Sequence, residues 1–323
     1  MTAATPSAPS LTDEGFAAVQ QACLERGLSV IRLADPADGW LGVQIQGGQQ
    51  PWELDVNCKS DALTRLPSIS LRTPARLLAH VGYHGTVCVS DNQGLSLDPD
   101  RRSEIVAFTV LAAFDLLEKW NADAAANSDE FYNELEGYWL GLPGAVRARA
   151  TVEVDGKDRL LKAYLNTKKG PSKWYFAERE GKSLLAFDTK GLASHRALYV
   201  HLPGPIAPPL YPNKLGPEFI ESVCEQMTAE QQALWDQLVG PSKNGPKHLA
   251  LLVSVPRAAG GFSLVGATFG AKAGKLDVTV PVTPLTVRRH TPSYMRERGG
   301  ASLELLSKHI VVLGCGAVGS VVA

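Results

Sequence analysis

The stretch from residue 28 to residue 58, "LSVIRLADPADGWLGVQIQGGQQPWELDVNC", carries the clearest structural signal in the chain. Short apolar segments alternate in it with "DPADG" and "GGQQP", which have the composition of turns. The apolar segments cover residues 28–33, 40–46 and 52–58, and "SISLRT" follows at 68–73. Short strands joined by tight turns pair with their sequence neighbours, so we predict a four-stranded antiparallel meander.

A helix is expected before this meander. Thr12 has the side chain of an N-cap, Asp13 and Glu14 suit a first helical turn, and Gly27 suits the end of the helix. The residues before it, 1–10, are rich in Ala, Pro, Ser and Thr and are expected to form a mobile tail.

Two more helices are expected after the meander. An irregular stretch at 80–100 is followed by apolar residues at helical spacing over about 101–120 and 129–139. Gly141, Pro143 and Gly144 then interrupt the chain, which predicts a boundary there. The first domain is therefore expected to span residues 11–141.

The rest of the chain divides into an α+β middle domain at 142–287 and a third segment at 288–323. Five strand-like segments in the middle domain surround a helical region at 216–238, and Pro/Gly-rich connectors separate them. The fold class predicted for the whole chain is α+β, with the start of an α/β domain at its end.

Composition excludes several classes of partner. Hydrophobic residues make up 45% of the 323 residues, and the net charge is −1. Neither nucleic acid nor an anionic membrane is favoured by such a charge, and the sequence has neither a signal peptide nor an apolar run long enough to span a bilayer. The five cysteines are scattered, which is typical of reduced thiols. These features predict a cytoplasmic location.

The third segment ends in a glycine fingerprint. "HIVVL" reads as a buried strand, and the residues after it include Gly314, Gly316 and Gly319. Glycines at these positions allow a tight turn, the approach of a phosphate to the backbone and the packing of a helix on the strand. Such a loop serves many nucleotides, so it predicts a nucleotide site without specifying the nucleotide.

Cys88 lies in "HGTVCV" within the irregular stretch, and three interpretations are open. Between Val87 and Val89 it resembles a small buried hydrophobe. With His80 and His84 it has a spacing of four, which would align metal ligands on a helix, but Gly82 and Gly85 disfavour a helix.

We therefore predict no metal site at His80, His84 and Cys88. The third interpretation is that Cys88 is a nucleophilic thiol.

Residues 11–139 resemble the bacterial relatives of ubiquitin-conjugating enzymes, because both have a helix, a meander, a cysteine-bearing irregular segment and further helices. "HGTVCV" matches their Gly-x-x-Cys-hydrophobic signature, and "DEFYNELEGYW" (129–139) resembles their acidic, aromatic helix. The resemblance implies that Cys88 is the thioester nucleophile, that Gly85 is the turn residue before it, and that His80 and His84 flank the site.

The sequence departs from this family at the residue that stabilises the oxyanion. The common pattern has His-Pro-Asn before the cysteine, whereas this chain has His80-Val81-Gly82. Backbone amides or another side chain would have to replace the Asn. The polar residues after Cys88 that could orient or deprotonate an incoming nucleophile are Asp91, Asn92, Asp98 and Asp100.

The segment "RRHTPSYMRERGGASLELLSKHIVVLGCGAVGS" (288–320) resembles the entry to ThiF-type adenylyltransferases, which include ubiquitin-activating enzymes. The resemblance implies that Gly314, Gly316 and Gly319 face ATP with its magnesium. It also implies that one arginine reaches the nucleotide, from the set Arg288, Arg289, Arg296 and Arg298. The family's remaining ATP residues and its own cysteine lie further along, so this chain alone is not expected to adenylate.

The order of the two resemblances is that of bacterial conjugating–activating fusions. It implies that a carboxyl group of a ubiquitin-like protein, or of another target with a free C-terminus, is adenylated and then carried on Cys88. Transfer to an acceptor amine or hydroxyl, a homodimeric full-length protein and a role in anti-phage defence are further implications of the family.

Two alternatives of other classes stay open. The glycine fingerprint could begin the dinucleotide domain of an NAD(P)-dependent oxidoreductase at His309, although that assigns nothing to Cys88. The first domain could also be a non-catalytic scaffold.

Overall fold

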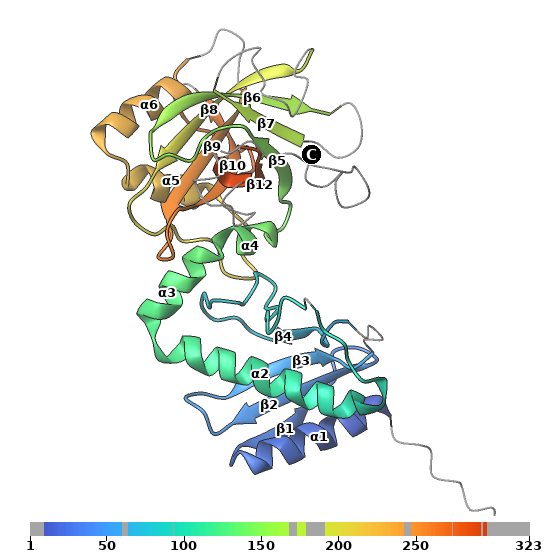
Figure 1. Ribbon diagram of the computed structural model, residues 1–323. Helices are drawn as coiled ribbons and strands as arrows, with labels where there is room; N and C mark the ends of the chain where they lie inside the picture. Colours follow the sequence, from blue (N-terminus) through green and yellow to red (C-terminus); the bar gives the residue numbers. More distant parts are fainter. Residues whose placement is uncertain are drawn as a thin grey trace, which may run out of the picture.

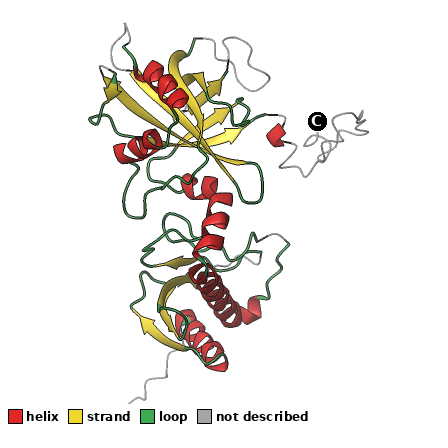
Figure 2. Ribbon diagram, turned by 90° about the vertical axis from the view of Figure 1, so that its left-hand side faces the viewer, coloured by secondary structure: helices red, strands yellow, loops and turns green. Residues whose placement is uncertain are grey.

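The computed structural model describes residues 10–59, 64–92, 94–167, 173–178, 191–241, 247–272, 274–291 and 293–295. In this part of the chain, two lobes are stacked one on the other, and a pair of short helices lies between them (Figure 1). A small sheet with two helices forms the first lobe, and a closed sheet with helices on its outside forms the second (Figure 2). The structure is mixed α+β, as predicted.

The first lobe contains the predicted meander. Its elements are α1 (Leu11–Glu25), β1 (Ser29–Leu33), β2 (Trp40–Gln46), β3 (Trp52–Asn57), β4 (Ile69–Leu71), the 3₁₀ turn η1 (Pro99–Arg101) and α2 (Arg102–Ala122). The strands pair antiparallel in the order β1-β2-β3-β4, and β2 has the bounds expected from the sequence. The prediction of a helix followed by a meander is confirmed.

Both helices of this lobe cover one face of the meander. Alternate residues of β3, among them Leu54 and Val56, are fully buried, as are Val19 on α1 and Leu117 on α2. Alternation puts every second side chain of a strand on the same face, so one apolar face suffices to anchor both helices. Among the described residues, no helix is both long enough and apolar enough to cross a bilayer.

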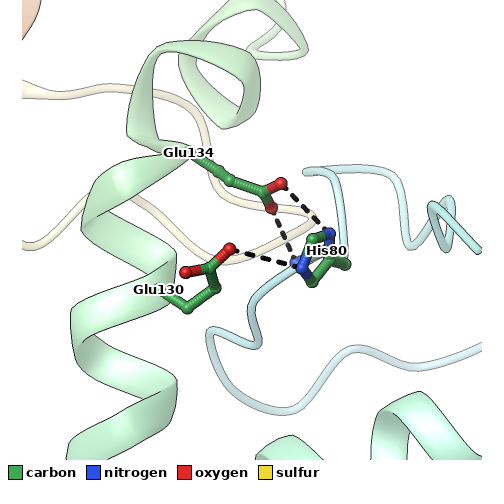
Figure 3. A group of neighbouring side chains, drawn as sticks. All are labelled: His80, Glu130 and Glu134. Atoms are coloured by element: carbon green, nitrogen blue, oxygen red, sulfur yellow. Dashed lines mark hydrogen bonds and ion pairs between the residues drawn. The ribbon is translucent and has the colours of Figure 1, made fainter. Parts of the chain in front are cut away.

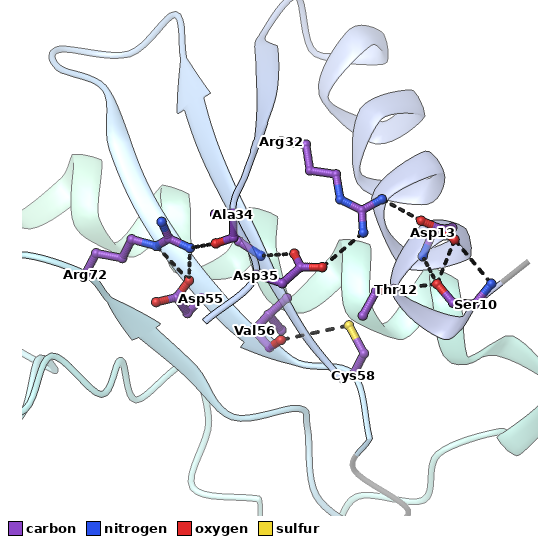
Figure 4. Close-up of polar contacts among 11 residues, drawn as sticks. Ser10, Thr12, Asp13, Arg32, Ala34, Asp35, Asp55, Val56, Cys58 and Arg72 are labelled. Atoms are coloured by element: carbon purple, nitrogen blue, oxygen red, sulfur yellow. Dashed lines mark hydrogen bonds and ion pairs between the residues drawn. The ribbon is translucent and has the colours of Figure 1, made fainter. Parts of the chain in front are cut away.

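The start of α1 differs from the prediction by two residues. Ser10, not Thr12, is the N-cap, because Ser10 and Asp13 exchange hydrogen bonds between side chain and backbone in a capping box. Asp13 also binds Arg32 at 2.6 Å, and Arg32 reaches Asp35 at 3.1 Å (Figure 4). This network ties the first turn of α1 to the end of β1. Gly27, at φ +69°, follows the helix as predicted.

The single helix expected at 129–139 is two helices, α3 (Ala124–Asn133) and α4 (Leu135–Leu140). α3 begins earlier than predicted because Asp123 caps it, accepting hydrogen bonds from two backbone amides. The backbone leaves helical geometry at Glu134, at φ −104° and ψ 5°. The chain therefore changes direction at Glu134, which lies between the two lobes.

The second lobe is built on a sheet that closes on itself. Its elements are β5 (Val146–Ala150), β6 (Arg159–Asn166), β7 (Lys173–Ala177), β8 (Ala193–His201), α5 (Pro217–Glu225), α6 (Ala229–Val239), β9 (Lys247–Pro256), β10 (Phe262–Lys272), β11 (Lys275–Leu276) and β12 (Thr283–Arg289). The order is β10-β12-β5-β7-β6-β8-β9, and β9 also pairs with β10. These seven strands form a closed barrel, and β11 extends β10 as a short hairpin.

Side chains fill the barrel. All seven strands contribute to one buried cluster, in which alanines such as Ala150 and Ala197 alternate with large residues such as Phe176 and Tyr199. Small residues opposite large ones let a narrow barrel close without a void. The alternate residues of β8 and β9 face outward and pack under α5 and α6.

Three strands were absent from the sequence prediction, namely β10, the two-residue β11 and β12. β10 reads "FSLVGATFGAK", a run of small and apolar residues with two glycines, and β12 contains Pro284. Glycine weakens a strand assignment, but here a Cβ at Gly266 would lie 2.8 Å from the Leu252 side chain. The boundary expected between residues 287 and 288 falls inside β12. Of the expected tail at residues 1–10, Ser10 instead caps α1, and residues 1–9 lie outside the described residues, as does the glycine fingerprint.

The two lobes are joined through α4. Glu136 binds Arg289, whose side chain is only 4% exposed, and it also binds Arg257 at 3.2 Å. The same carboxylate accepts the backbone N–H of Leu264 at 2.8 Å. Close by, the indole N–H of Trp139 donates to the carbonyl of Gly266 at 2.9 Å. α4 is thus held to the barrel by a charged and largely desolvated contact.

Three tyrosines add hydrogen bonds across the same junction. The hydroxyl groups of Tyr83, Tyr132 and Tyr138 donate to backbone carbonyls in the loop after β8, at 2.7–2.8 Å. The accepting carbonyls belong to Asn213, Ile206 and Pro209, respectively. Because the donors come from the first lobe and from α3–α4, this loop is fastened to both.

We expect Glu136→Gln to lower the free energy of unfolding by roughly 3 kcal/mol, because it leaves the buried guanidinium of Arg289 without its counter-charge. Urea denaturation followed by tryptophan fluorescence measures the change. The matched control is Glu104→Gln, whose partner Arg101 is exposed and whose stability should stay close to that of the wild type. Equal losses for the two variants would contradict the role given to Glu136.

Candidate functional site

The irregular stretch around Cys88 folds back on itself as a narrow ribbon. The backbone N–H of Cys88 donates to the carbonyl of His80 at 2.8 Å, and Val81 pairs with Val87 in a β-bridge. In such an antiparallel pair, residues that face each other share one side of the ribbon. The buried valines occupy the inner side, so His80 and Cys88 lie together on the other side.

The tip of the ribbon requires glycine. Gly85 has φ +82°, and a Cβ there would lie 2.3 Å from the backbone oxygen of Leu71. Both the left-handed backbone and the close approach exclude a side chain. Gly85 therefore lets the ribbon turn tightly against the end of β4.

Cys88 is the exposed thiol among the four cysteines that the structure describes. Cys23 and Cys58 are buried, and Cys224 is partly buried. The interpretation of Cys88 as a small buried hydrophobe is therefore wrong, because the register of the ribbon turns it away from Val87. Its sulfur donates to the carbonyl of Ser90 at 3.6 Å.

Local surroundings keep this thiol protonated at neutral pH. Partial burial raises the pKa of Cys88, and the negative charges of Glu134 and Asp91 raise it further. Cys58 and Cys224 are less acidic still, since burial raises the pKa of Cys58 to about 11 and that of Cys224 to about 12. Cys88 is thus distinguished by access more than by acidity.

A pocket of about 450 Å³ opens beside the thiol. Its walls come from the ribbon and from α3–α4, and the residues that bear on the chemistry are His80, Gly82, Thr86, Cys88, Phe131, Glu134 and Tyr138. The pocket therefore lies where the first lobe meets the connecting helices.

His80 is held against these helices by two carboxylates. Its Nδ1 lies 3.0 Å from Glu134 Oε1, and its Nε2 lies 3.5 Å from Glu130 Oε1 (Figure 3). The backbone N–H of His80 also donates to Glu134 at 3.0 Å. These contacts stabilise a left-handed backbone at φ +60°, which is uncommon for a residue with a side chain.

The electrostatics of this contact favour an imidazolium. The hydrogen bond that the His80 ring donates to Glu134 raises the pKa of His80, although burial opposes it. Burial also works against ionised Glu134, yet hydrogen bonds from His80 hold the pKa of its carboxyl below the ordinary value. Since both ring nitrogens face carboxylates, His80 acts on Cys88 through the backbone and the shape of the ribbon.

The other predicted residues lie in different places. His84 is exposed at the ribbon tip, 4.8 Å from the ring of Tyr83 and 5.8 Å from that of Tyr211, and it is not part of the pocket wall. His80, His84 and Cys88 do not share a helix, as Gly82 and Gly85 predicted.

The polar residues after Cys88 separate into two groups. Asn92, at φ +58°, donates through Nδ2 to the carbonyl of Ser90 at 3.3 Å, and this is the carbonyl that accepts the Cys88 thiol. The Oδ1 atom of Asn92 accepts the backbone N–H of Leu66 at 2.9 Å. Asp98, by contrast, caps η1, where it accepts the N–H of Asp100.

Sequence reasoning missed Glu130 and Glu134. The only local signal was their spacing of four within "DEFYNELEGYW", which places both carboxylates on one helical face. Their histidine partner is about 50 residues away in the chain, so the pattern could not reveal the contact.

Most of the residues predicted to contact a nucleotide lie outside the described part of the chain. Gly314, Gly316 and Gly319 lie outside the described residues, as do Arg296 and Arg298. Arg289 does not reach towards a nucleotide, because its guanidinium is buried against Glu136 and the carbonyl of Phe262. No model of a known protein family matches the chain, and no curated protein sequence matches it.

We expect iodoacetamide to alkylate Cys88 at least about ten times faster than Cys224 in the folded protein, because access limits the reaction of buried thiols. Peptide mapping by mass spectrometry over a time course measures both rates. Cys88→Ala should remove the fast site and leave the others unchanged. Comparable rates at Cys88 and Cys224 would contradict the exposure assigned to the thiol.

Proposed function

We propose that this protein is a protein-conjugation enzyme that carries an activated protein carboxyl group as a thioester on Cys88. The observation that carries the proposal is an exposed thiol on a glycine-tipped ribbon, at the rim of a pocket and next to a histidine held by a glutamate. A thioester keeps its acyl-transfer potential and stays open to attack by an amine, which is what a carrier needs.

The chemistry requires one bond to form and one to break. The sulfur of Cys88 attacks the carbonyl carbon of an acyl adenylate or of another thioester. The bond to AMP or to the first sulfur breaks, and its electron pair leaves with that group. The thiol proton passes to the leaving group, so the step needs no oxidant or reductant.

The high pKa of the thiol fits a carrier better than a hydrolase. A thiol of raised pKa holds little thiolate at neutral pH, so it reacts slowly with ordinary amides. The thiolate that does form is strongly nucleophilic, which suffices for an activated acyl group. Redox pairing is disfavoured in this lobe, because Cys23 and Cys58 are buried. Cys88 therefore acts alone.

Asn92 supplies an amide donor for the oxyanion that forms during transfer. Its Nδ2 and the thiol of Cys88 both contact the carbonyl of Ser90, so the donor lies on the same side of the ribbon as the reacting sulfur. An amide N–H directed at the developing charge lowers the barrier to acyl transfer. Asn92 thus replaces the Asn that this chain lacks before the cysteine.

The remaining parts of the proposal concern the rest of the chain. We propose a bacterial, cytoplasmic pathway, in anti-phage defence, in which a ThiF-type domain that follows β12 uses ATP and magnesium to activate the C-terminus of a ubiquitin-like or other target protein. The barrel orients the thiol relative to that domain, and the protein is a homodimer. No step is assigned to Gly314, Gly316 or Gly319, which lie outside the described residues.

Incubation of the chain with the C-terminal thioester of a short peptide should transfer the peptide to Cys88. We expect an adduct that hydroxylamine and dithiothreitol release, because a thioester is labile to both. Intact-mass and peptide mass spectrometry locate it and give its rate of formation.

Two variants make the result specific. Each variant removes one thiol, but only Cys88→Ala removes the exposed one. Cys224→Ala should therefore keep the adduct, and Cys88→Ala should lose it. Transfer to Cys88 no faster than to Cys224 would refute an acyl-carrier function and would leave a binding role for the first lobe.

A further inference from the structure

We propose that His80, Glu130 and Glu134 bind a divalent transition-metal ion. One donor atom from each of the three side chains lies within 4.8 Å of the other two. The histidine comes from the ribbon, Glu130 lies in the last turn of α3, and Glu134 is the C-cap of the same helix. The three donors therefore converge from two separate elements (Figure 3). A modest inward movement would bring them to metal–ligand distances of about 2.0–2.2 Å.

Charge balance favours a cation in this cluster. Two carboxylates face one imidazole, so even a protonated His80 leaves a net charge of −1 among the three side chains. A divalent ion that replaces the proton brings the sum to zero, with a neutral imidazole and two carboxylates as ligands. Partly buried groups gain most from such neutralisation, because water screens them less.

Arginines of this protein make clusters of the same ratio, because Arg32 faces Asp13 and Asp35 and Arg159 faces Asp155 and Glu178. A guanidinium stays charged and has no lone pair for a metal, whereas an imidazole can lose its proton and ligate. The contact of Glu136 differs from all of these. There, two arginines face one carboxylate. The cluster at His80 has the opposite ratio. Lys119 adds a positive charge that acts on His80, but its ammonium lies over the ring of Trp120, 4.1 Å from the centroid, and it is not one of the three donors. The excess of negative charge therefore occurs where an imidazole can also ligate.

Access and ligand type indicate which ion binds. His80 and Glu134 line the pocket of about 450 Å³ beside Cys88, through which an ion and its remaining waters can enter. An imidazole ligand disfavours Mg²⁺, whereas Zn²⁺ accepts one imidazole and two carboxylates with water as a further ligand. We therefore assign the site to Zn²⁺ or an ion of similar preference.

A bound ion would fix the position of the thiol-bearing ribbon. His80 accepts the N–H of Cys88 through its carbonyl, so anchoring its ring to α3–α4 also anchors the thiol. This consequence rests on the proposed function, but metal binding itself does not. Binding is measured without any acyl donor, so its failure would leave the thioester experiment unaffected.

Isothermal titration of the metal-free chain with ZnCl₂ tests the site. We expect the wild-type protein to bind one Zn²⁺. The Zn²⁺ affinity of Glu130→Gln/Glu134→Gln and of His80→Asn should be about 100-fold lower, because each variant loses at least one direct ligand. The wild-type affinity should not change in millimolar Mg²⁺. Cys88→Ser should keep the site, since the thiol is not one of the three ligands.

The matched control is Glu221→Gln/Glu225→Gln on α5, which removes two exposed glutamates that are also four residues apart. Among the described residues, neither belongs to a cluster of possible metal ligands. It should bind Zn²⁺ like the wild type. Glu130→Gln alone provides a second variant. It removes the charge from the longer contact to His80 at 3.5 Å and keeps an oxygen that can accept the amide of Asn133, so the metal-free melting temperature should be unchanged. Undiminished Zn²⁺ affinity in a folded Glu130→Gln/Glu134→Gln variant would overturn the proposal.

Discussion

One change of chain direction, at Glu134, connects the thiol to the rest of the molecule. Glu134 binds the ring and backbone of His80 on the ribbon, and Glu136, two residues later, binds Arg289 and Arg257 on the barrel. The two carboxylates, only two residues apart in the chain, thus bind different lobes. Because both contacts are partly or largely desolvated, each is costly to break, and the position of Cys88 relative to the barrel depends on them.

The ribbon itself can adopt its shape only with this support. His80 and Asn92 both have left-handed backbones, which cost free energy for residues with a Cβ. Each is compensated locally, His80 by Glu134 and Asn92 by its hydrogen bonds to Leu66 and Ser90. Strained residues on both sides of an exposed thiol, each held by a specific partner, are typical of a preorganised reactive site.

Much of the first lobe could be predicted from the sequence, because alternation and turn residues act over a few positions. The meander followed from such local patterns. β10 escaped notice because Gly266 packs against Leu252 and Gly270 against Val280, and no local pattern reports such contacts. The exposure of Cys88 could not be predicted for a similar reason. Its valine neighbours suggested burial, but the pairing of Val81 with Val87 sets which side it faces. Glu130 and Glu134 stayed hidden because their partner is distant in sequence.

The contact between His80 and Glu134 can be tested as the positioning device for Cys88 by a double-mutant cycle. His80→Asn, which tolerates the left-handed backbone, and Glu134→Gln are compared singly and together in the metal-free protein. The rate measured is peptide transfer from a thioester to Cys88, with melting temperatures as a check on folding. If the contact positions the thiol, peptide transfer in the double variant should be at most slightly slower than in either single variant. Such rates correspond to a coupling energy between His80 and Glu134 of about 1 kcal/mol or more. Losses that simply multiply, or no loss in either variant, would contradict it.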